Sequence, residues 1–213
     1  MSDALLSTSS TSPAGDAVAP VRKRPKPGER RVQILQALAT MLEQPGAERI
    51  TTAALAARLE VSEAALYRHF ASKAQMFEGL IEFIEQTVFS LINQITEREP
   101  DGAAQAGKVI AMLLQFAEKN PGMTRVMVGD ALVFENERLQ QRMNQFFDKI
   151  ESTLKQGLRS VAEAQGSATP SVDAQVRASA LTAFVVGRLQ RFARSGFKRA
   201  PSEHLEASLA LML

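Results

Sequence analysis

Apolar residues recur every three or four positions from about residue 29 to the end of the chain, with polar residues between them. This spacing matches the roughly 3.6-residue turn of an α-helix and places the apolar side chains on one side. The first run extends from Val32 to Leu42 and stops at Pro45-Gly46, a pair typical of turns. No credible strand is visible, so the pattern predicts an all-α fold.

Capping and turn-forming residues divide the rest of the pattern into successive helices. Ser72 is a candidate N-cap for a long helix that lasts to about Arg98 and ends before Pro100-Asp101-Gly102. Asn120-Pro121-Gly122 and the segment 166–170 interrupt the second half of the chain in the same way. The predicted helices cover residues 32–42, 51–59, 62–70, 72–98, 103–119, 123–129, 132–164, 172–194 and 203–213.

Residues 51–70 predict two short helices joined by a tight turn at Val61. Thr51 and Ser62 are candidate N-caps, because their hydroxyls can accept hydrogen bonds from the first free backbone N–H groups of a helix. In the second helix Leu66 and Phe70 stand four residues apart and therefore share one buried side. The arrangement is typical of a helix-turn-helix.

The opposite side of the second short helix has the properties of a surface that reads DNA. At roughly 100° per residue, Ala64, Ala65 and Arg68 lie opposite the buried pair, and Tyr67 and His69 lie on the two flanks. Small residues let a helix approach base edges in the major groove, a long donor reads them, and flanking polar groups reach phosphates. An ordinary amphipathic helix with an alanine-rich exposed side fits the same residues.

Charge and composition narrow the remaining possibilities. The net charge is +2, but six basic residues and one acid give +5 between positions 21 and 31. Residues 1–19 are rich in Ser, Thr, Ala, Gly and Pro, so we expect residues 1–27 to form a disordered tail with a basic end. The basic end is expected to contact phosphates, although a solvated linker without a function is the alternative for residues 1–19. A helix-turn-helix domain is predicted for residues 28–75 and a larger helical dimerisation and regulatory domain for residues 76–213.

Several classes of function find little support. The chain has no cysteine and only two histidines, far apart in sequence, so we expect no metal site and no cofactor. No stretch approaches a membrane span and no signal-peptide core is visible, which predicts a cytoplasmic protein. An enzyme is not expected, because there is no nucleophile motif, Gly-rich phosphate loop or paired His or Cys.

The segment VSEAALYRHFASKAQMF, residues 61–77, resembles the recognition helix and following segment of the TetR-type transcriptional regulators. The resemblance implies DNA binding, with Tyr67, His69 and Lys73 at the phosphates. The expected DNA-binding residues are Thr51, Thr52, Ser62, Glu63, Ala64, Ala65, Tyr67, Arg68, His69 and Lys73. A ligand-responsive repressor of this family is one possible function.

The predicted helix 172–194 favours dimerisation. Leu181, Phe184, Val185, Val186 and Leu189, together with Ala178, Ala180 and Ala183, cover more than one side of it. A helix that is apolar most of the way round needs burial on several sides, which a second copy of the chain would supply. The two recognition helices of such a dimer, about 34–36 Å apart, would then fit a palindromic DNA site. A helix buried wholly within one protomer is the alternative.

Segments spread from Ile50 to Ser202, among them GLIEFIEQ and EKNPGMTRVMVGDALVFENERLQQRMNQFFDKIE, resemble the nucleoid-occlusion branch of this family, the SlmA-type proteins. The resemblance implies a homodimer on palindromic DNA, association with neighbouring dimers, nucleoid localisation, and binding to the C-terminal tail of the tubulin-like division protein FtsZ. The resemblance therefore also implies that septum assembly is blocked over the chromosome.

In this family, the groove that binds the partner lies between the long helix that follows the helix-turn-helix and the next helix. Phe83 and Asn120 match its pattern, and Lys119 completes the expected partner site. Leu91, Gln115 and Lys119 fall where related chains often carry Arg, Gly and Arg, so these contacts can differ. Because Leu80, Ile81 and Ile84 already supply the buried stripe, the Phe83 ring should be exposed; packing of Phe83 in the core is the alternative.

Overall fold

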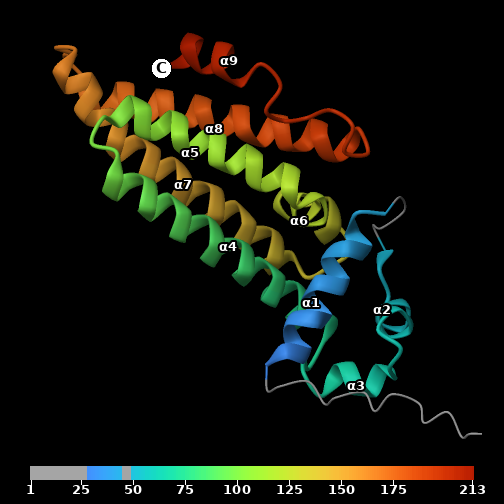
Figure 1. The fold of residues 1–213 in the computed structure, drawn as a ribbon. Coiled ribbons are helices and arrows are strands. Elements are labelled where there is room, and N and C mark those ends of the chain that lie inside the picture. Colours follow the sequence, from blue (N-terminus) through green and yellow to red (C-terminus); the bar gives the residue numbers. More distant parts are fainter. Residues whose placement is uncertain (1–27, 45–48) are drawn as a thin grey trace, which may run out of the picture.

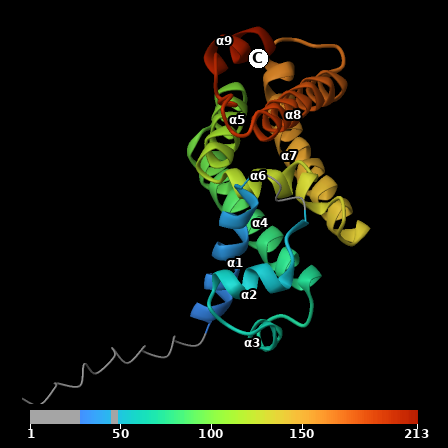
Figure 2. The same ribbon diagram turned by 90° about the vertical axis from the view of Figure 1, so that its right-hand side faces the viewer.

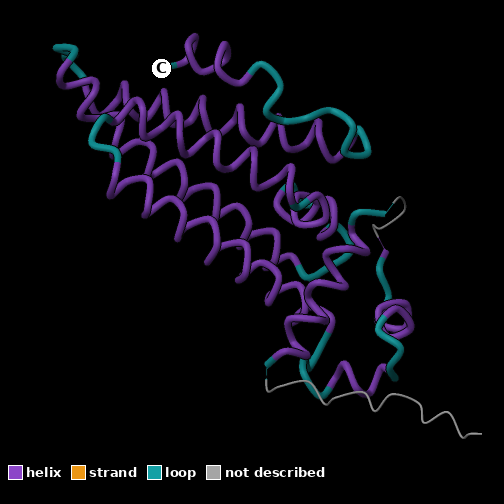
Figure 3. The backbone as a smooth tube through the Cα atoms, viewed as in Figure 1, coloured by secondary structure: helices purple, strands orange, loops and turns teal. Residues whose placement is uncertain are grey.

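The computed structural model describes residues 28–44 and 49–213, and all regular secondary structure in these ranges is helical (Figures 1 and 3). The all-α prediction is confirmed. The predicted tail 1–27 lies outside the described residues. The helices are α1 Glu29–Leu42, α2 Thr52–Arg58, α3 Glu63–Tyr67, α4 Lys73–Arg98, α5 Gly102–Lys119, α6 Pro121–Met127, the 3-10 turn η2 Asp130–Leu132, α7 Glu137–Ala164, α8 Pro170–Arg194 and α9 Leu205–Met212.

The predicted N-caps fix the starts of α2, α3 and α4. The hydroxyl of Thr51 accepts a hydrogen bond from the Ala54 N–H at 3.1 Å, and that of Ser62 accepts from Ala65 at 3.3 Å. Ser72 accepts from the Gln75 N–H at 3.2 Å. Each cap satisfies a backbone donor that the first helical turn leaves without a partner.

Three predicted helix boundaries differ from the structure by three residues or more. The first helix was predicted from Val32 and begins as α1 at Glu29. The predicted helix 62–70 ends as α3 at Tyr67, and His69 is a turn residue whose carbonyl accepts a hydrogen bond from the Arg31 guanidinium. The predicted helix 132–164 begins only at Glu137, because the side chain of Asn136 accepts a hydrogen bond from the Arg138 N–H at 3.0 Å and caps α7 there. Residues 133–136 therefore form a connecting loop between η2 and α7.

The helices form a small head, α1–α3, joined to a larger bundle by α4, which starts beside α3 and runs along the bundle (Figures 1 and 2). In the bundle α7 and α8 pack against each other, and α5 packs on both. α1 and α6 pack closely where head and bundle meet: a Cβ atom on Gly122 would lie 1.9 Å from the Ala39 carbonyl oxygen. Only glycine allows this approach of two backbones.

One continuous set of buried apolar side chains connects the head with the bundle, from Ile34 and Leu38 of α1 through Phe77 and Ile84 of α4 to Leu189 of α8. Within the described ranges, no helix combines the length and hydrophobicity needed to cross a bilayer. The same residues contain no group of three or more His, Asp or Glu side chains that could hold a metal ion.

Candidate nucleic-acid interface and partner groove

The exposed side of α3 lies at the end of the molecule opposite α9 (Figures 1 and 2). Tyr67 is 45 % exposed, and Ala64 and Arg68 are exposed beside it. Leu66 and Phe70 are each only 1 % exposed and anchor the other side in the core of the head. The division into a buried and an exposed side predicted from the sequence is confirmed, and no residue of 28–44 or 49–213 covers the face that carries Tyr67 and Arg68.

Four of the predicted DNA-binding residues also hold the two short helices together. The Thr52 hydroxyl donates to the Glu63 carboxylate at 2.5 Å, which links α2 to α3. Thr51 and Ser62 use their hydroxyls as caps. These contacts fix the angle between α2 and α3, and contact of these four residues with DNA stays a prediction.

Arg31 supports the end of α3 in a way that the sequence did not reveal. Its guanidinium donates to the His69 carbonyl and lies 4.1 Å from the centre of the Phe70 ring. In the sequence, Arg31 stands out only as part of the basic segment 21–31. Its partners are 38 and 39 positions away, so no local pattern could identify them. His69 itself is half-buried, and Ala65 is half-buried beneath the exposed face.

Lys73, the first residue of α4, points toward the bundle. Its Nζ lies 2.5 Å from Oε1 of Glu135, in the loop before α7, and 5.7 Å from the centre of the Phe77 ring. The Lys73 side chain is 31 % exposed and that of Glu135 only 9 %. A phosphate contact by Lys73 stays a prediction, and in the free protein this ammonium already has an acidic partner.

The same loop and the start of α7 make further contacts with the head and α4. The guanidinium of Arg49 lies 4.5 Å from the centre of the Phe134 ring. Arg142 of α7 binds both carboxylate oxygens of Glu85 on α4, at 3.0 and 2.6 Å. The hydrogen bond to Glu85 raises the pKa of Arg142, although burial opposes the shift. This bidentate pair fixes α4 against α7.

α4 and α5 form an antiparallel hairpin that turns at residues 99–101, and we call the surface between them the α4–α5 groove. The Phe83 ring on α4 is 47 % exposed, whereas Leu80, Ile81 and Ile84 are buried. Lys119, at the end of α5, is exposed and has no hydrogen-bond or ion-pair partner among residues 28–44 and 49–213. Asn120 is half-buried, and its amide donates to the Phe116 carbonyl at 2.7 Å.

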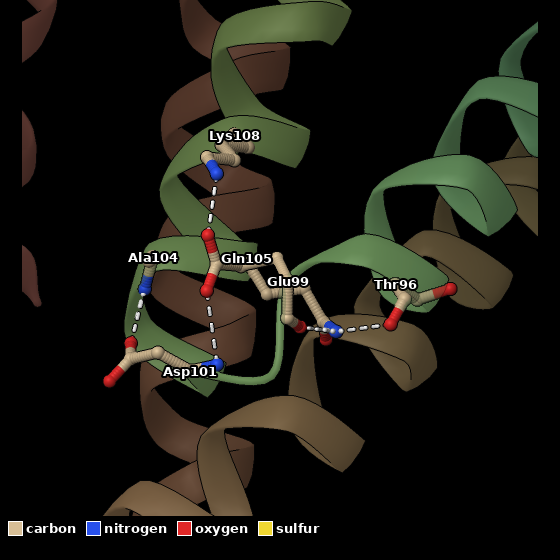
Figure 4. Close-up of polar contacts among 6 residues, drawn as sticks. All are labelled: Thr96, Glu99, Asp101, Ala104, Gln105 and Lys108. Atoms are coloured by element: carbon tan, nitrogen blue, oxygen red, sulfur yellow. Dashed lines mark hydrogen bonds and ion pairs between the residues drawn. The ribbon is translucent and has the colours of Figure 1, made fainter.

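The far end of the α4–α5 groove is held by a local polar cluster (Figure 4). The Glu99 carboxylate accepts from the Lys108 ammonium at 2.5 Å and from the Asp101 N–H at 3.1 Å. These hydrogen bonds lower the pKa of Glu99, and the one from Lys108 has the larger effect. The Gln105 amide donates to the carbonyls of Thr96 and Glu99, at 3.5 and 3.2 Å, and so satisfies the end of α4.

α8 buries one side in its own protomer and leaves another apolar side exposed. Leu181, Val185 and Leu189 are buried, whereas Val172 and Val176 are 58 % and 63 % exposed. Ala180 and Ala183 continue the exposed side. Small and apolar residues at helical spacing suit close packing of a second helix. Dimerisation stays a prediction, and this exposed side of α8 is the surface through which it would occur.

Comparison with known proteins identifies two regions of the chain. Residues 34–80 match the family model of bacterial regulatory proteins of the TetR family, and residues 102–213 match the SlmA-like type of tetracyclin repressor-like C-terminal domain. The nucleoid occlusion factor SlmA of Vibrio vulnificus is 53 % identical over 188 residues, which cover 88 % of this chain and 95 % of that protein. That of Aliivibrio fischeri is 52 % identical over 189 residues, covering 88 % and 96 %.

Solved structures show the same fold at low sequence identity. The transcriptional regulator FadR from Bacillus subtilis, in complex with stearoyl-CoA, superposes with a TM-score of 0.68 at 14 % identity, covering 85 % of this chain and 96 % of that one. FadR from Bacillus halodurans gives a TM-score of 0.70 at 12 % identity, covering 90 % and 97 %. At this identity the likeness concerns the fold alone.

Proposed function

The chain belongs to the SlmA family of nucleoid occlusion factors within the TetR-type regulators, and on this premise we propose that it blocks septum assembly over the chromosome. It binds palindromic chromosomal sites as a homodimer through the exposed side of α3. While bound to DNA it engages the C-terminal tail of FtsZ in the α4–α5 groove and antagonises FtsZ polymers. The protein is therefore nucleoid-associated.

The observation that carries DNA binding is the uncovered side of α3. Ala64 permits a close approach, Arg68 supplies a long donor for base edges, and the Tyr67 hydroxyl on the flank suits a phosphate. His69 follows in the turn after α3, and Lys73 is the first residue of α4. Residues 28–75 act as the DNA-binding domain and residues 76–213 as the dimerisation and partner-binding domain.

Partner binding is supported by the exposed Phe83 ring and by the charge of Lys119, which has no acidic partner within the described ranges. A large exposed aromatic ring on a helix whose buried side is complete is typical of an interaction surface. An apolar side chain beside a cation suits a short peptide with apolar and acidic residues. Asn120 lies at the α5–α6 junction, where its amide caps the end of α5.

Dimerisation is supported by the exposed apolar side of α8. Val172, Val176 and Ala183 recur at helical spacing on that side. Pairing of two copies there covers these side chains and sets two α3 helices at a fixed separation, as successive major-groove contacts require. Further association of dimers on DNA would place several partner grooves along one chromosomal segment.

The decisive experiment is cosedimentation of polymerised FtsZ with the full-length protein, with and without a palindromic duplex that the protein selects from random DNA. We expect polymer mass to fall, and polymer turnover to rise, only when the duplex is present. Unchanged polymer mass and turnover in both conditions would contradict the division-inhibitor function. Release of the duplex on addition of a small-molecule effector would instead support the ligand-responsive repressor.

A further inference from the structure

The end of α8 and the loop after it carry positive charge that no neighbouring residue in the sequence balances. Residues 174–202 contain six basic residues and no Asp or Glu, although the net charge of the whole chain is only +2. Arg191 in the last turn of α8 and Lys198 and Arg199 in the loop are exposed. None of these three side chains has a hydrogen-bond or ion-pair partner among the residues that the structure describes. We call them the basic surface.

The other three basic residues of this segment serve other contacts. Arg177 and Arg188 donate hydrogen bonds to neighbouring side chains, at 3.1 and 3.3 Å. Arg194 lies 18 residues after Val176, which is about five helical turns, and so continues the side of α8 through which dimerisation is proposed. The basic surface is therefore the part of this charge that stays open to a ligand.

Local contacts hold the loop after α8 in a fixed shape. The Ser195 hydroxyl accepts hydrogen bonds from the N–H groups of Lys198 and Arg199, at 3.1 and 3.0 Å. Phe197 has a positive φ of 64°, and its ring packs on that of Phe192 with the centres 5.2 Å apart. A bulky residue keeps this left-handed conformation only where its surroundings hold it. The two cations therefore project from an ordered backbone, and an anion that binds them has to order their side chains only.

The basic surface offers charge but no apolar pocket. Phe197 is half-buried, and the depression of about 530 Å³ beside it is lined by Lys198, Arg199, Ala200, Ser202 and Glu203. The one acid of this lining, Glu203, lies 3.7 Å from the imidazole of the next residue. Peptides and membranes are usually bound with apolar side chains as well as charges, whereas the phosphates of a duplex are bound by cations alone. The surface thus favours DNA.

Two helices separate the basic surface from α3. The start of α1 contacts the end of α3 through Arg31, and farther along α1 Ala39 packs on Gly122 of α6. α6 in turn contacts the loop after α8, because the guanidinium of Arg125 lies 5.2 Å from the centre of the Phe197 ring. α1 and α6 therefore lie between α3 and the basic surface (Figures 1 and 2). A duplex on the exposed side of α3 lies beyond the end of the head, so a duplex at the basic surface is a different segment.

We propose that the basic surface binds the phosphates of a second DNA segment without regard to sequence, so that one dimer bridges two parts of the chromosome. This inference goes beyond the proposed function and rests on it only for the first segment, which α3 holds. A protein fixed on the chromosome is surrounded by other segments of the same DNA, so a weak contact is populated at this high local concentration. About one phosphate for each cation gives roughly six for a dimer, and each contributes about −0.9 to the slope of log affinity against log salt.

A bridging assay on the full-length protein tests the proposal. The palindromic duplex that the protein selects is fixed to beads, loaded with protein and washed, and a fluorescent duplex of random sequence is added at low salt. We expect the beads to retain the random duplex, and retention to fall steeply as salt is raised. Lys198→Glu combined with Arg199→Glu should reduce retention roughly tenfold and leave binding to the palindromic duplex unchanged. Lys149→Glu combined with Arg159→Glu, at two exposed positions of α7, makes the same change in charge and should retain the random duplex.

The outcomes separate this inference from the proposed function. If the protein selects no palindromic duplex, the proposed function fails; if it binds that duplex but the beads retain no random duplex, only the bridging fails. Equal retention by the loop variant and the unchanged protein would mean that the α3 helices of other copies hold the random duplex, and the inference would be wrong. Should the loop variant also lose the palindromic duplex, Lys198→Gln combined with Arg199→Gln decides by the same criterion.

A second arm distinguishes DNA phosphates from lipid phosphates. The loop variant and the unchanged protein are sedimented with vesicles of phosphatidylcholine and phosphatidylserine in equal amounts. A loss of vesicle binding in the variant, with bridging unchanged, would assign the basic surface to a membrane and overturn the inference. Sedimentation velocity of both proteins without DNA should give the same dimer; a monomeric variant would assign the surface to the contact between protomers instead.

Discussion

Replacing Glu135 by glutamine should strengthen DNA binding, because the ammonium of Lys73 must leave Glu135 to reach a phosphate. The two groups lie 2.5 Å apart, and Glu135 is nearly buried. Surface ion pairs contribute about 0.2–1 kcal/mol, and the shielded position of Glu135 puts this pair near the upper value. Removing the competing charge should therefore raise DNA affinity by about fivefold for each protomer, or roughly 30-fold for a dimer that uses both lysines.

Fluorescence anisotropy titrations of the selected duplex at fixed salt measure this effect. Glu137→Gln is the matched control, because it removes the same charge from an exposed residue two positions away. A general loss of negative charge would strengthen binding equally in both variants, whereas competition for Lys73 affects only Glu135→Gln. In the background of Lys73→Ala the Glu135→Gln effect should vanish. If Glu135→Gln leaves affinity unchanged or weakens it, the pair does not compete with DNA.

Three further predictions concern the head and its junction. Tyr67→Phe should weaken binding to specific and random duplexes alike by about 0.5–1.5 kcal/mol, since only one hydroxyl hydrogen bond is lost. A loss confined to the specific duplex would instead show that Tyr67 contacts bases. Arg68→Ala should reduce the preference for the specific duplex by roughly 1–3 kcal/mol per half-site, measured by competition titration, and an unchanged preference would exclude a base contact. Gly122→Ala should lower the free energy of unfolding by about 1–3 kcal/mol, because the new Cβ would clash with the Ala39 carbonyl oxygen. Urea titrations measure this change. Equal stability of the variant would mean that α1 and α6 separate easily.

Local chemistry explains what could be predicted from the sequence. The caps at Thr51, Ser62 and Ser72 need only a hydroxyl three residues before a free N–H, so the starts of three helices follow from neighbouring residues. The exposure of Phe83 followed from the complete buried stripe beside it. These predictions depend on helix geometry, which repeats every few residues.

The interactions that were missed join residues far apart in the chain. Lys73 and Glu135 are 62 positions apart, and Arg31 and His69 are 38 apart. The break before α7 was missed because Leu132 continues the apolar pattern, while the side chain of Asn136 sets the helix start. Such partners are selected by the tertiary fold and leave no periodic signal.

α4 begins in the head at Lys73 and continues as one uninterrupted helix past Phe83 to Arg98. At about 1.5 Å per residue, Phe83 lies roughly 15 Å and Arg98 roughly 38 Å along the axis from Lys73, which the proposed function places beside the duplex. The helix therefore acts as a short rigid spacer. If the groove holds a filament's tail as proposed, the filament is kept within a few nanometres of the chromosome, and its inhibition is confined to the places where DNA is present.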